Sequence, residues 1–91
     1  QAEPREARYH LRMGIAIYLR AKARGDAAPP AGAQRALQKA VAFDPKNDEA
    51  WLYLGHVALA AGEKERAKRC YQHAVALNAG SGDAKKALKA L

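Results

Sequence analysis

The 91-residue sequence has little of what several protein classes require. It holds one cysteine, Cys70, so no disulfide can form within the chain. Its three histidines, His10, His56 and His73, are not spaced like the ligands of a metal site. Few residues are β-branched, and no stretch alternates apolar and polar residues at the period of a strand. These absences argue against a disulfide-stapled domain, a zinc domain and a β-sheet protein.

Long apolar stretches are missing as well. The longest run without a charged residue extends from Ala50 to Gly62 and is interrupted by His56, whereas a bilayer span needs roughly 20 apolar residues. The sequence contains no phosphate-binding loop, nucleophile elbow or paired-carboxylate motif. We therefore expect a soluble chain that is not an enzyme and binds no metal or cofactor.

Acidic residues are scarcer than basic ones, which gives a net charge of +7. Residues 1–24 carry six Lys/Arg against two Glu, and residues 63–91 carry seven against three acidic residues. Such ends could attract nucleic acid or an anionic surface. However, the basic residues of the first segment spread around a helix, and no aromatic residue interrupts the basic run at 64–69. We therefore expect most of these basic residues to lie on helix faces that contact solvent. Binding of nucleic acid or another anionic polymer is the weakest of the alternative functions.

Apolar residues recur at three- and four-residue intervals, which predicts an all-α fold. Paired prolines within residues 25–32 predict a loop, while Pro45 and Gly62 predict shorter turns. Asn47 and Ser81 are the expected N-caps of the helices that follow them. The predicted helices run from about Pro4 to Arg24, Ala33 to Phe43, Asp48 to Ala61, Lys64 to Asn78 and Gly82 to Leu91.

Residues 48–81 contain one complete helix-turn-helix pattern. Gly55 and Ala67 are small where two antiparallel backbones must approach closely, and Trp51 and Tyr71 should supply the buried area. This pattern resembles the tetratricopeptide repeat (TPR), a 34-residue helical hairpin. The residues that carry the resemblance are Trp51-x-x-Leu54-Gly55, Gly62 at the turn, and Ala67-x-x-x-Tyr71-x-x-Ala74.

The resemblance extends upstream to a divergent copy of the same pattern. It implies one domain over residues 1–91, with a divergent repeat at 1–47, the complete repeat at 48–81 and a capping helix at 82–91. The first copy also carries an inserted loop at 25–32, which either contacts a partner or has no functional role. The implied fold is all-α, with antiparallel hairpins stacked as a short right-handed α-solenoid. The matching residues of the first copy are Gly14, Ala33, Leu37, Ala40 and Pro45.

The resemblance also implies a binding site, because the first helices of successive TPR hairpins line a concave groove. From the sequence alone, Tyr53 and His56 lie one turn apart on their helix. They lie opposite the face that should pack into the core, formed by Trp51, Leu54 and Ala58, so both should be partly exposed. Leu52 and Leu59 either face a ligand or pack on a neighbouring helix or a missing repeat. The partner-binding residues implied by the family are Arg8, Leu11, Arg12, Ile15, Tyr18, Leu19, Glu49, Leu52, Tyr53, His56 and Leu59.

A subset of the family binds acidic C-terminal peptides through a carboxylate clamp of Lys, Asn and Arg side chains. None of the clamp side chains is present here, so we predict that the chain is not a receptor of that kind. The corresponding positions hold Leu11, Ile15, Tyr53, Asp83 and Ala87.

The remaining reactive side chains favour structural roles. The cations of Arg66, Lys68 and Arg69 could lower the pKa of the Cys70 thiol, but the sequence positions no His or Asp partner to make it a nucleophile. We interpret Cys70 as a semi-buried helix cysteine and the histidines as structural or surface residues.

Together these patterns predict a non-enzymatic interaction module that binds a peptide or protein segment, as an adaptor or assembly part of a larger protein. Arg8, Arg12 and Glu49 would set the orientation of the partner. The alternative is a structural module that stacks on itself or on adjoining repeats. Because the chain begins at Gln1 and not Met, we expect a processed product or a fragment of a larger or anchored protein. We expect it to be located in the cytoplasm or the periplasm of a bacterium.

Overall fold

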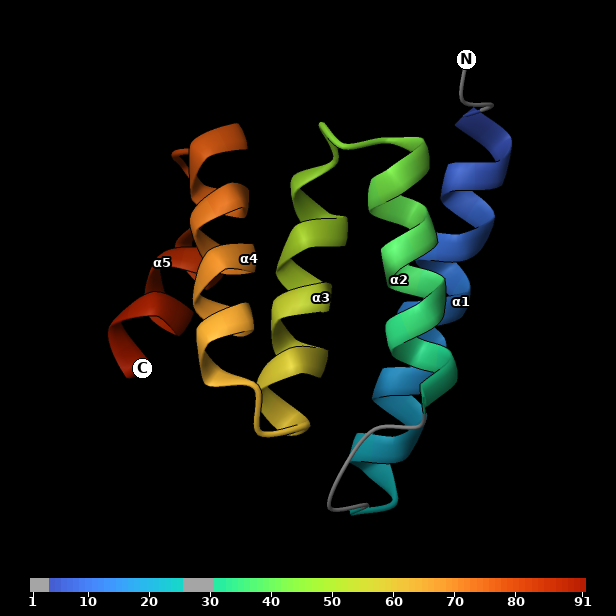
Figure 1. Ribbon diagram of the computed structural model, residues 1–91, viewed down its shortest axis with the longest axis horizontal. Coiled ribbons are helices and arrows are strands. Elements are labelled where there is room, and N and C mark those ends of the chain that lie inside the picture. The colour runs from blue at the N-terminus through green and yellow to red at the C-terminus, as the bar shows by residue number, and fades with distance from the viewer. Residues whose placement is uncertain (1–3, 26–30) are drawn as a thin grey trace.

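Five helices make up the computed structural model, which describes residues 4–25 and 31–91 and contains no strand within those ranges (Figure 1). Every predicted helix is present, and its ends lie within two residues of the expected positions. The predicted loop at 25–32 falls mostly on residues 26–30, outside the described ranges. The helices are α1 (Pro4–Ala23), α2 (Ala31–Phe43), α3 (Asp48–Ala60), α4 (Lys64–Leu77) and α5 (Gly82–Ala90).

Helices that follow one another in the chain pack against one another. In Figure 1, α2 lies in front of α1, α4 lies in front of α5, and α3 lies between the two pairs. The closest packing joins α1 to α2 and α3 to α4, so the molecule is built from two helical hairpins with α5 packed on α4. A direct contact between α1 and α3 brings the first helices of the two hairpins together. The predicted all-α class with stacked hairpins is confirmed.

The predicted helix ends have a visible chemical cause. The side-chain oxygen of Asn47 accepts a hydrogen bond from the Ala50 backbone N–H at 3.2 Å, and the Ser81 hydroxyl accepts one from Ala84 N–H at 3.4 Å. Both caps satisfy backbone donors that the first turn of a helix leaves unpaired. Gly62 has a φ of 84°, which glycine adopts without strain and which allows the short turn between α3 and α4. Both N-cap predictions are confirmed.

A glycine in each hairpin lets its two helices approach closely. A Cβ placed on Gly14 would lie 2.5 Å from Leu37 Cγ, and one placed on Gly55 would lie 2.6 Å from Tyr71 Cε1. Both distances are far below van der Waals contact, and both partner side chains are completely buried. The predicted close approach at Gly55 is confirmed, and Gly14 repeats it in the first hairpin.

The buried side chains form two clusters. The larger one joins both hairpins and includes Leu11, Leu37, Leu54 and Val57. The smaller one surrounds Tyr71, together with Ala58 and Ala67, and is covered by partly buried residues of α5. In this arrangement α5 is attached to the second hairpin, through the smaller cluster and its contact with α4.

Trp51 departs from its predicted place in the core. It is only partly buried, whereas Tyr71 is completely buried. Its indole N–H donates a hydrogen bond to the Pro45 carbonyl at 2.8 Å, and its ring stacks on His73 with centroids 4.3 Å apart. The indole N–H needs a polar partner, and the carbonyl before α3 supplies one near the surface. Trp51 therefore lies at the edge of the core and not in its centre.

Candidate functional site

Three aromatic rings from two helices meet where α1 contacts α3. Tyr18 of α1 stacks on His56 of α3 with ring centroids 6.0 Å apart and planes 12° apart. Tyr53, one turn before His56, packs edge-on against both rings at 6.1 and 5.5 Å. Ile15 lies one turn before Tyr18 and packs, like Tyr18 and Tyr53, against the larger cluster. We call Ile15, Tyr18, Tyr53 and His56 the α1–α3 surface.

A hydrogen bond ties the α1–α3 surface to the core. Nδ1 of His56 lies 2.8 Å from the hydroxyl oxygen of Tyr71, the buried residue beneath Gly55. Burial, reinforced by Tyr18 and Cys70, raises the pKa of Tyr71 to about 12, so its hydroxyl stays protonated and can donate to a neutral imidazole. The surface ring of His56 is thus held in place by a side chain of the second hairpin's interior.

Charges of opposite sign act on His56 from two helices. Burial lowers the pKa of His56 below its usual 6.5, the cation of Lys22 lowers it further, and the Asp83 carboxylate of α5 opposes them. Lys22 also places its ammonium group 6.0 Å from the centre of the Tyr18 ring, at the outer limit of a cation–π contact. Burial raises the pKa of Tyr18 as well. The α1–α3 surface is therefore uncharged near neutral pH, with a cation and an anion at its margins.

The structure brings some of the predicted partner-binding residues together and leaves others apart. Leu11 is a correction: it is only 7% exposed and belongs to the larger cluster, because its side of α1 faces Leu37 and Leu54. Leu52 packs against the smaller cluster, next to residues of α5, which matches the alternative that it contacts a neighbouring helix. The exposed predicted residues are Arg8, Arg12, Leu19, Glu49 and Leu59, and the partly buried ones are Ile15, Tyr18, Leu52, Tyr53 and His56.

Tyr53 and His56 are both partly exposed, as the helical spacing predicts. Leu19 lies one turn beyond Ile15 and Leu59 one turn beyond His56, and both are exposed large hydrophobic residues. They extend the apolar character of the α1–α3 surface along both helices.

A family model for the tetratricopeptide repeat matches residues 26–91. The chain belongs to the tetratricopeptide repeat family. No curated protein and no solved structure matches it. TPR repeats generally mediate protein–protein interaction, and their helical hairpins are not a catalytic fold. The internal copy of the Gly–large residue contact, Gly14 with Leu37 and Gly55 with Tyr71, agrees with this membership.

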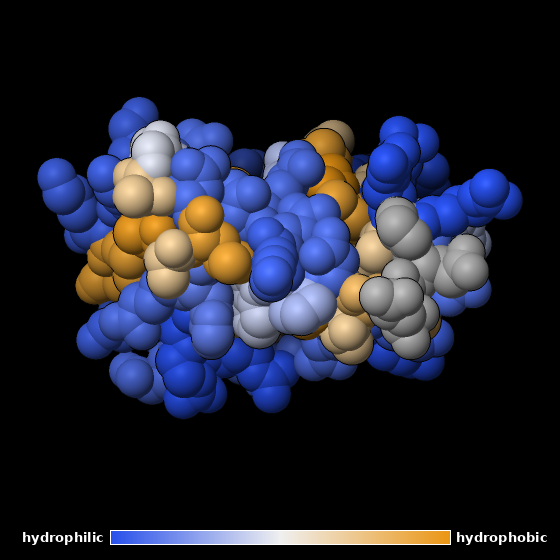
Figure 2. Space-filling model, turned by 90° about the horizontal axis from the view of Figure 1, so that it is seen from above, coloured by the Kyte–Doolittle hydropathy of each residue, from blue (hydrophilic) through white to orange (hydrophobic). Residues whose placement is uncertain are grey.

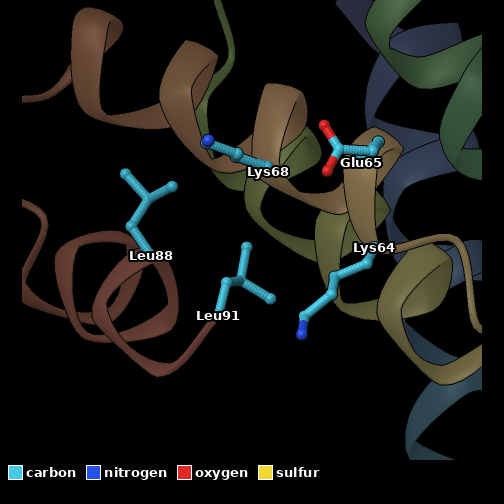
Figure 3. A pocket seen from close by; sticks show the side chains of 5 residues that line it. All are labelled: Lys64, Glu65, Lys68, Leu88 and Leu91. Carbon is cyan, nitrogen blue, oxygen red and sulfur yellow. The ribbon is translucent and has the colours of Figure 1, made fainter.

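The TPR hairpins also leave hollows that the sequence patterns did not reveal. One lies between α4 and α5 and encloses about 340 Å³. Figure 3 shows Leu88 of α5 and Leu91, the residue that follows α5, pointing into it, opposite Lys64 and Lys68 of α4. Glu65 also lines this α4–α5 cleft, so its rim carries both signs of charge.

A second hollow, of about 230 Å³, lies on the side where α2 and α4 flank α3. We call it the α2–α4 cleft. Trp51, Leu54 and Cys70 give it apolar and weakly polar walls, while Arg69 and His73 add cationic or neutral polar groups. The sequence could not indicate it, because the cleft depends on the distance between helices of different hairpins.

On the face that Figure 2 shows, the exposed apolar residues lie in separate patches. Figure 2, which views the molecule from above, shows hydrophilic residues over most of that face and hydrophobic side chains gathered in patches, one of them at the end where α4 and α5 lie. Tyr9 of α1 and Leu77 of α4 are exposed in addition to Leu19 and Leu59. Within the part of the chain that the structure describes, no helix is long and apolar enough to cross a membrane.

Cys70 and the histidines acquire distinct surroundings. Cys70 is buried, and desolvation raises the pKa of its thiol more strongly than the cations of Arg66 and Arg69 lower it. The basic neighbours thus act on this pKa in the direction that the sequence suggests, but burial outweighs them and the pKa is raised. His10 stacks on Phe43 with centroids 5.5 Å apart. Among residues 4–25 and 31–91, no group of three His, Cys, Asp or Glu residues is arranged to hold a metal ion.

Proposed function

We propose that the α1–α3 surface binds a peptide or protein segment, and that the chain serves as a non-catalytic adaptor or assembly part of a larger protein. The observation that carries this proposal is the set of three partly exposed rings, Tyr18, Tyr53 and His56, which pack against one another and come from the first helices of both hairpins. In TPR proteins these helices face the binding groove, so the rings lie where a partner would be expected.

The rings have the properties of interaction anchors. Tyrosine combines a large apolar face with a polar hydroxyl and loses little conformational entropy, which explains its enrichment at binding hot spots. Here Tyr18 and Tyr53 already pack against the larger cluster, and His56 is fixed by Tyr71. A partner would therefore meet a surface whose side chains are ordered before binding, and this reduces the entropic cost of association.

Exposed charges would orient the bound segment. Arg8 and Arg12 are exposed one turn apart on α1, and Glu49 is exposed in the first turn of α3. Charges at the margin of an apolar patch influence specificity and association rate more than affinity. We propose that a segment with apolar residues at its centre and an acidic residue toward α1 fits this arrangement best.

The test is selection from a random peptide library followed by calorimetry on the winning peptide. A Tyr18→Ala/Tyr53→Ala variant should bind about thirtyfold more weakly or worse, the loss typical of a hot spot. Gln72→Ala, an exposed change on α4, is the matched control and should leave the affinity unchanged. Both variants must first show wild-type helicity by circular dichroism. Equal affinity of the double variant and the wild type would exclude the α1–α3 surface as the binding site.

Two further measurements separate this proposal from its alternatives. A chain that binds by self-stacking should show a mass that rises with concentration in light scattering, whereas the adaptor should remain a monomer at high micromolar concentration. An acidic peptide with a free C-terminal carboxylate should bind no better than its amidated form, because Leu11, Ile15 and Tyr53 occupy carboxylate-clamp positions.

A further inference from the structure

We propose that the α2–α4 cleft is a second binding site, which takes an acidic peptide segment that inserts one aromatic or aliphatic side chain. The cleft combines Trp51 and Leu54 of α3 with Gln38 of α2 and the side chains of α4. The α1–α3 surface is formed by α1 and a different set of α3 side chains, so this site extends the interaction surface beyond the function proposed above.

The walls of the α2–α4 cleft supply an apolar anchor point. The Trp51 ring is only partly buried, yet it is fixed from two sides, by the hydrogen bond to Pro45 and by the stacked ring of His73. Leu54 and Cys70 lie beside it and are almost completely buried. A rigid aromatic wall next to a recess is typical of positions where one inserted side chain contributes much of the binding energy.

The charge around the cleft selects an acidic partner. Arg66 and Arg69 line it and no acidic residue does. Arg66 is partly engaged with Glu63 at 3.5 Å, but Arg69 is exposed and has no ion-pair partner within the described ranges. Arg35 and Lys39 add exposed positive charge along α2, the other flank of the cleft. A carboxylate beside the inserted side chain would form charge-assisted hydrogen bonds with Arg69.

The size of the cleft indicates a side chain and not a whole metabolite. Small-molecule sites usually enclose about 300–1,000 Å³, and the α2–α4 cleft encloses about 230 Å³. The α4–α5 cleft is larger, but it has no aromatic wall and Glu65 on its lining would repel an acidic segment. The two hollows therefore serve as test site and control on the same helix, α4.

Trp51 makes the proposal directly measurable, because it is the only tryptophan in the sequence. The probe is a capped peptide with a central Phe and Glu residues on both sides, and the readout is Trp51 fluorescence during titration. We expect a saturable change in emission, and we expect it to disappear when the central Phe of the peptide is replaced by Ala. No saturable change up to millimolar peptide would overturn the proposal.

Charge variants locate the site. Arg69→Gln should weaken binding about five- to tenfold, and Gln38→Glu, on the opposite wall, should weaken it by a similar factor. Lys68→Gln removes the same charge from α4 at the other cleft and should change the affinity less than about twofold. Equal weakening by Lys68→Gln and Arg69→Gln would show general attraction to a basic surface and overturn the site.

Two controls distinguish this site from other forms of binding. The Tyr18→Ala/Tyr53→Ala variant should retain the Trp51 fluorescence response to the acidic peptide. The fluorescence titration therefore tests the α2–α4 cleft, and the calorimetry described above tests the α1–α3 surface independently. A short DNA duplex that produced the same Trp51 response, with the same dependence on Arg69, would instead identify the partner as an anionic polymer and refute the peptide proposal.

Discussion

The two hairpins meet the same packing requirement with different residues. In the first, Gly14 of α1 faces Leu37 of α2, and in the second, Gly55 of α3 faces Tyr71 of α4. Leu37 ends in methyl groups, so its side chain brings no polar atom to the first contact. Tyr71 fills the equivalent place with a ring whose hydroxyl reaches His56 at 2.8 Å. The second hairpin thus connects its interior to a side chain of the proposed binding surface, whereas the first cannot do so through this position.

The comparison separates two roles of one buried position. The close approach of the helices requires only a small residue facing a large one. The polar tip of the large residue is an additional property, and it determines whether the core positions a surface ring. Changes to the glycine test the first role, and changes to the hydroxyl and to His56 test the second.

The largest effect should come from filling the glycine positions. Gly55→Ala places a methyl group against three atoms of the rigid Tyr71 ring, so overpacking should cost about 1–3 kcal/mol, more than the helix-propensity gain of up to about 1 kcal/mol for replacing glycine. Gly14→Ala should cost less, because the flexible Leu37 side chain can rearrange more readily than a ring. Urea unfolding monitored by circular dichroism measures both changes.

Gly82→Ala provides the matched control for these substitutions. Gly82 is in a helix like the other two, but no atom lies within 4 Å of its added Cβ. This variant should be neutral or slightly stabilised. If Gly14→Ala proved more destabilising than Gly55→Ala, the rigidity of the Tyr71 ring would not be what distinguishes the hairpins.

A smaller effect should follow from removing only the hydroxyl of Tyr71. Tyr71→Phe deletes the hydrogen bond to His56 and should lower the free energy of unfolding by about 0.5–1.5 kcal/mol. The cost should fall near the lower end, because water can reach the half-buried His56 ring and replace the lost partner. Thermal or urea unfolding gives the stability, and NMR of the imidazole shows whether the ring still has one orientation.

Tyr53→Phe is the control for Tyr71→Phe. Tyr53 shares the aromatic contacts of the α1–α3 surface, but its hydroxyl makes no protein hydrogen bond among those of the described residues. It should therefore leave both stability and His56 orientation unchanged. An equal loss in both variants would remove the special role of Tyr71.

The smallest effect should be a pH dependence of the free energy of unfolding, caused by His56 of the second hairpin. The pKa of His56 is lower in the folded chain than its usual 6.5, so the unfolded chain binds a proton more readily. The His56 contribution is therefore complete above about pH 6.5 and is lost as the pH falls through the window below it. In His56→Gln, the free energy of unfolding should change less with pH below about pH 6.5.

Variants of the charged neighbours of His56 test the same assignment. Lys22→Gln removes a cation that lowers the pKa of His56, so NMR titration should show that pKa rising, and Asp83→Asn should lower it. A stability slope that persists in His56→Gln would assign the titration to another group.

Much of the fold could be predicted because its signals are local. Pro45, Asn47, Gly62 and Ser81 mark turns and caps through their own backbone and side-chain chemistry, so the helix ends could be placed to within two residues. The Gly55–Tyr71 contact follows from helical spacing within one hairpin. These inferences need only residues that are close in the sequence.

The candidate site was less predictable because it depends on the rotation of one helix against another. Helical spacing placed Tyr53 and His56 on one face, but it could not show that Tyr18 stacks on His56 or that Leu11 turns into the core. The pKa of Cys70 has the same difficulty: its basic neighbours are visible in the sequence, whereas the burial that outweighs them is not. The partial exposure of Trp51 likewise follows from packing between hairpins.

Because α5 is held by few buried residues, we expect local unfolding of the molecule to begin there. The helix has nine residues, of which only Ala84 is buried, and helices shorter than about 12–15 residues are marginal in water without tertiary support. Its undocking should therefore need less free energy than global unfolding, so its amides should exchange with deuterium before those of α3 and α4. Each such opening would briefly uncover the side of the second hairpin that Leu88 and Leu91 cover. This side of the second hairpin would then expose apolar side chains transiently while the rest of the fold stays closed.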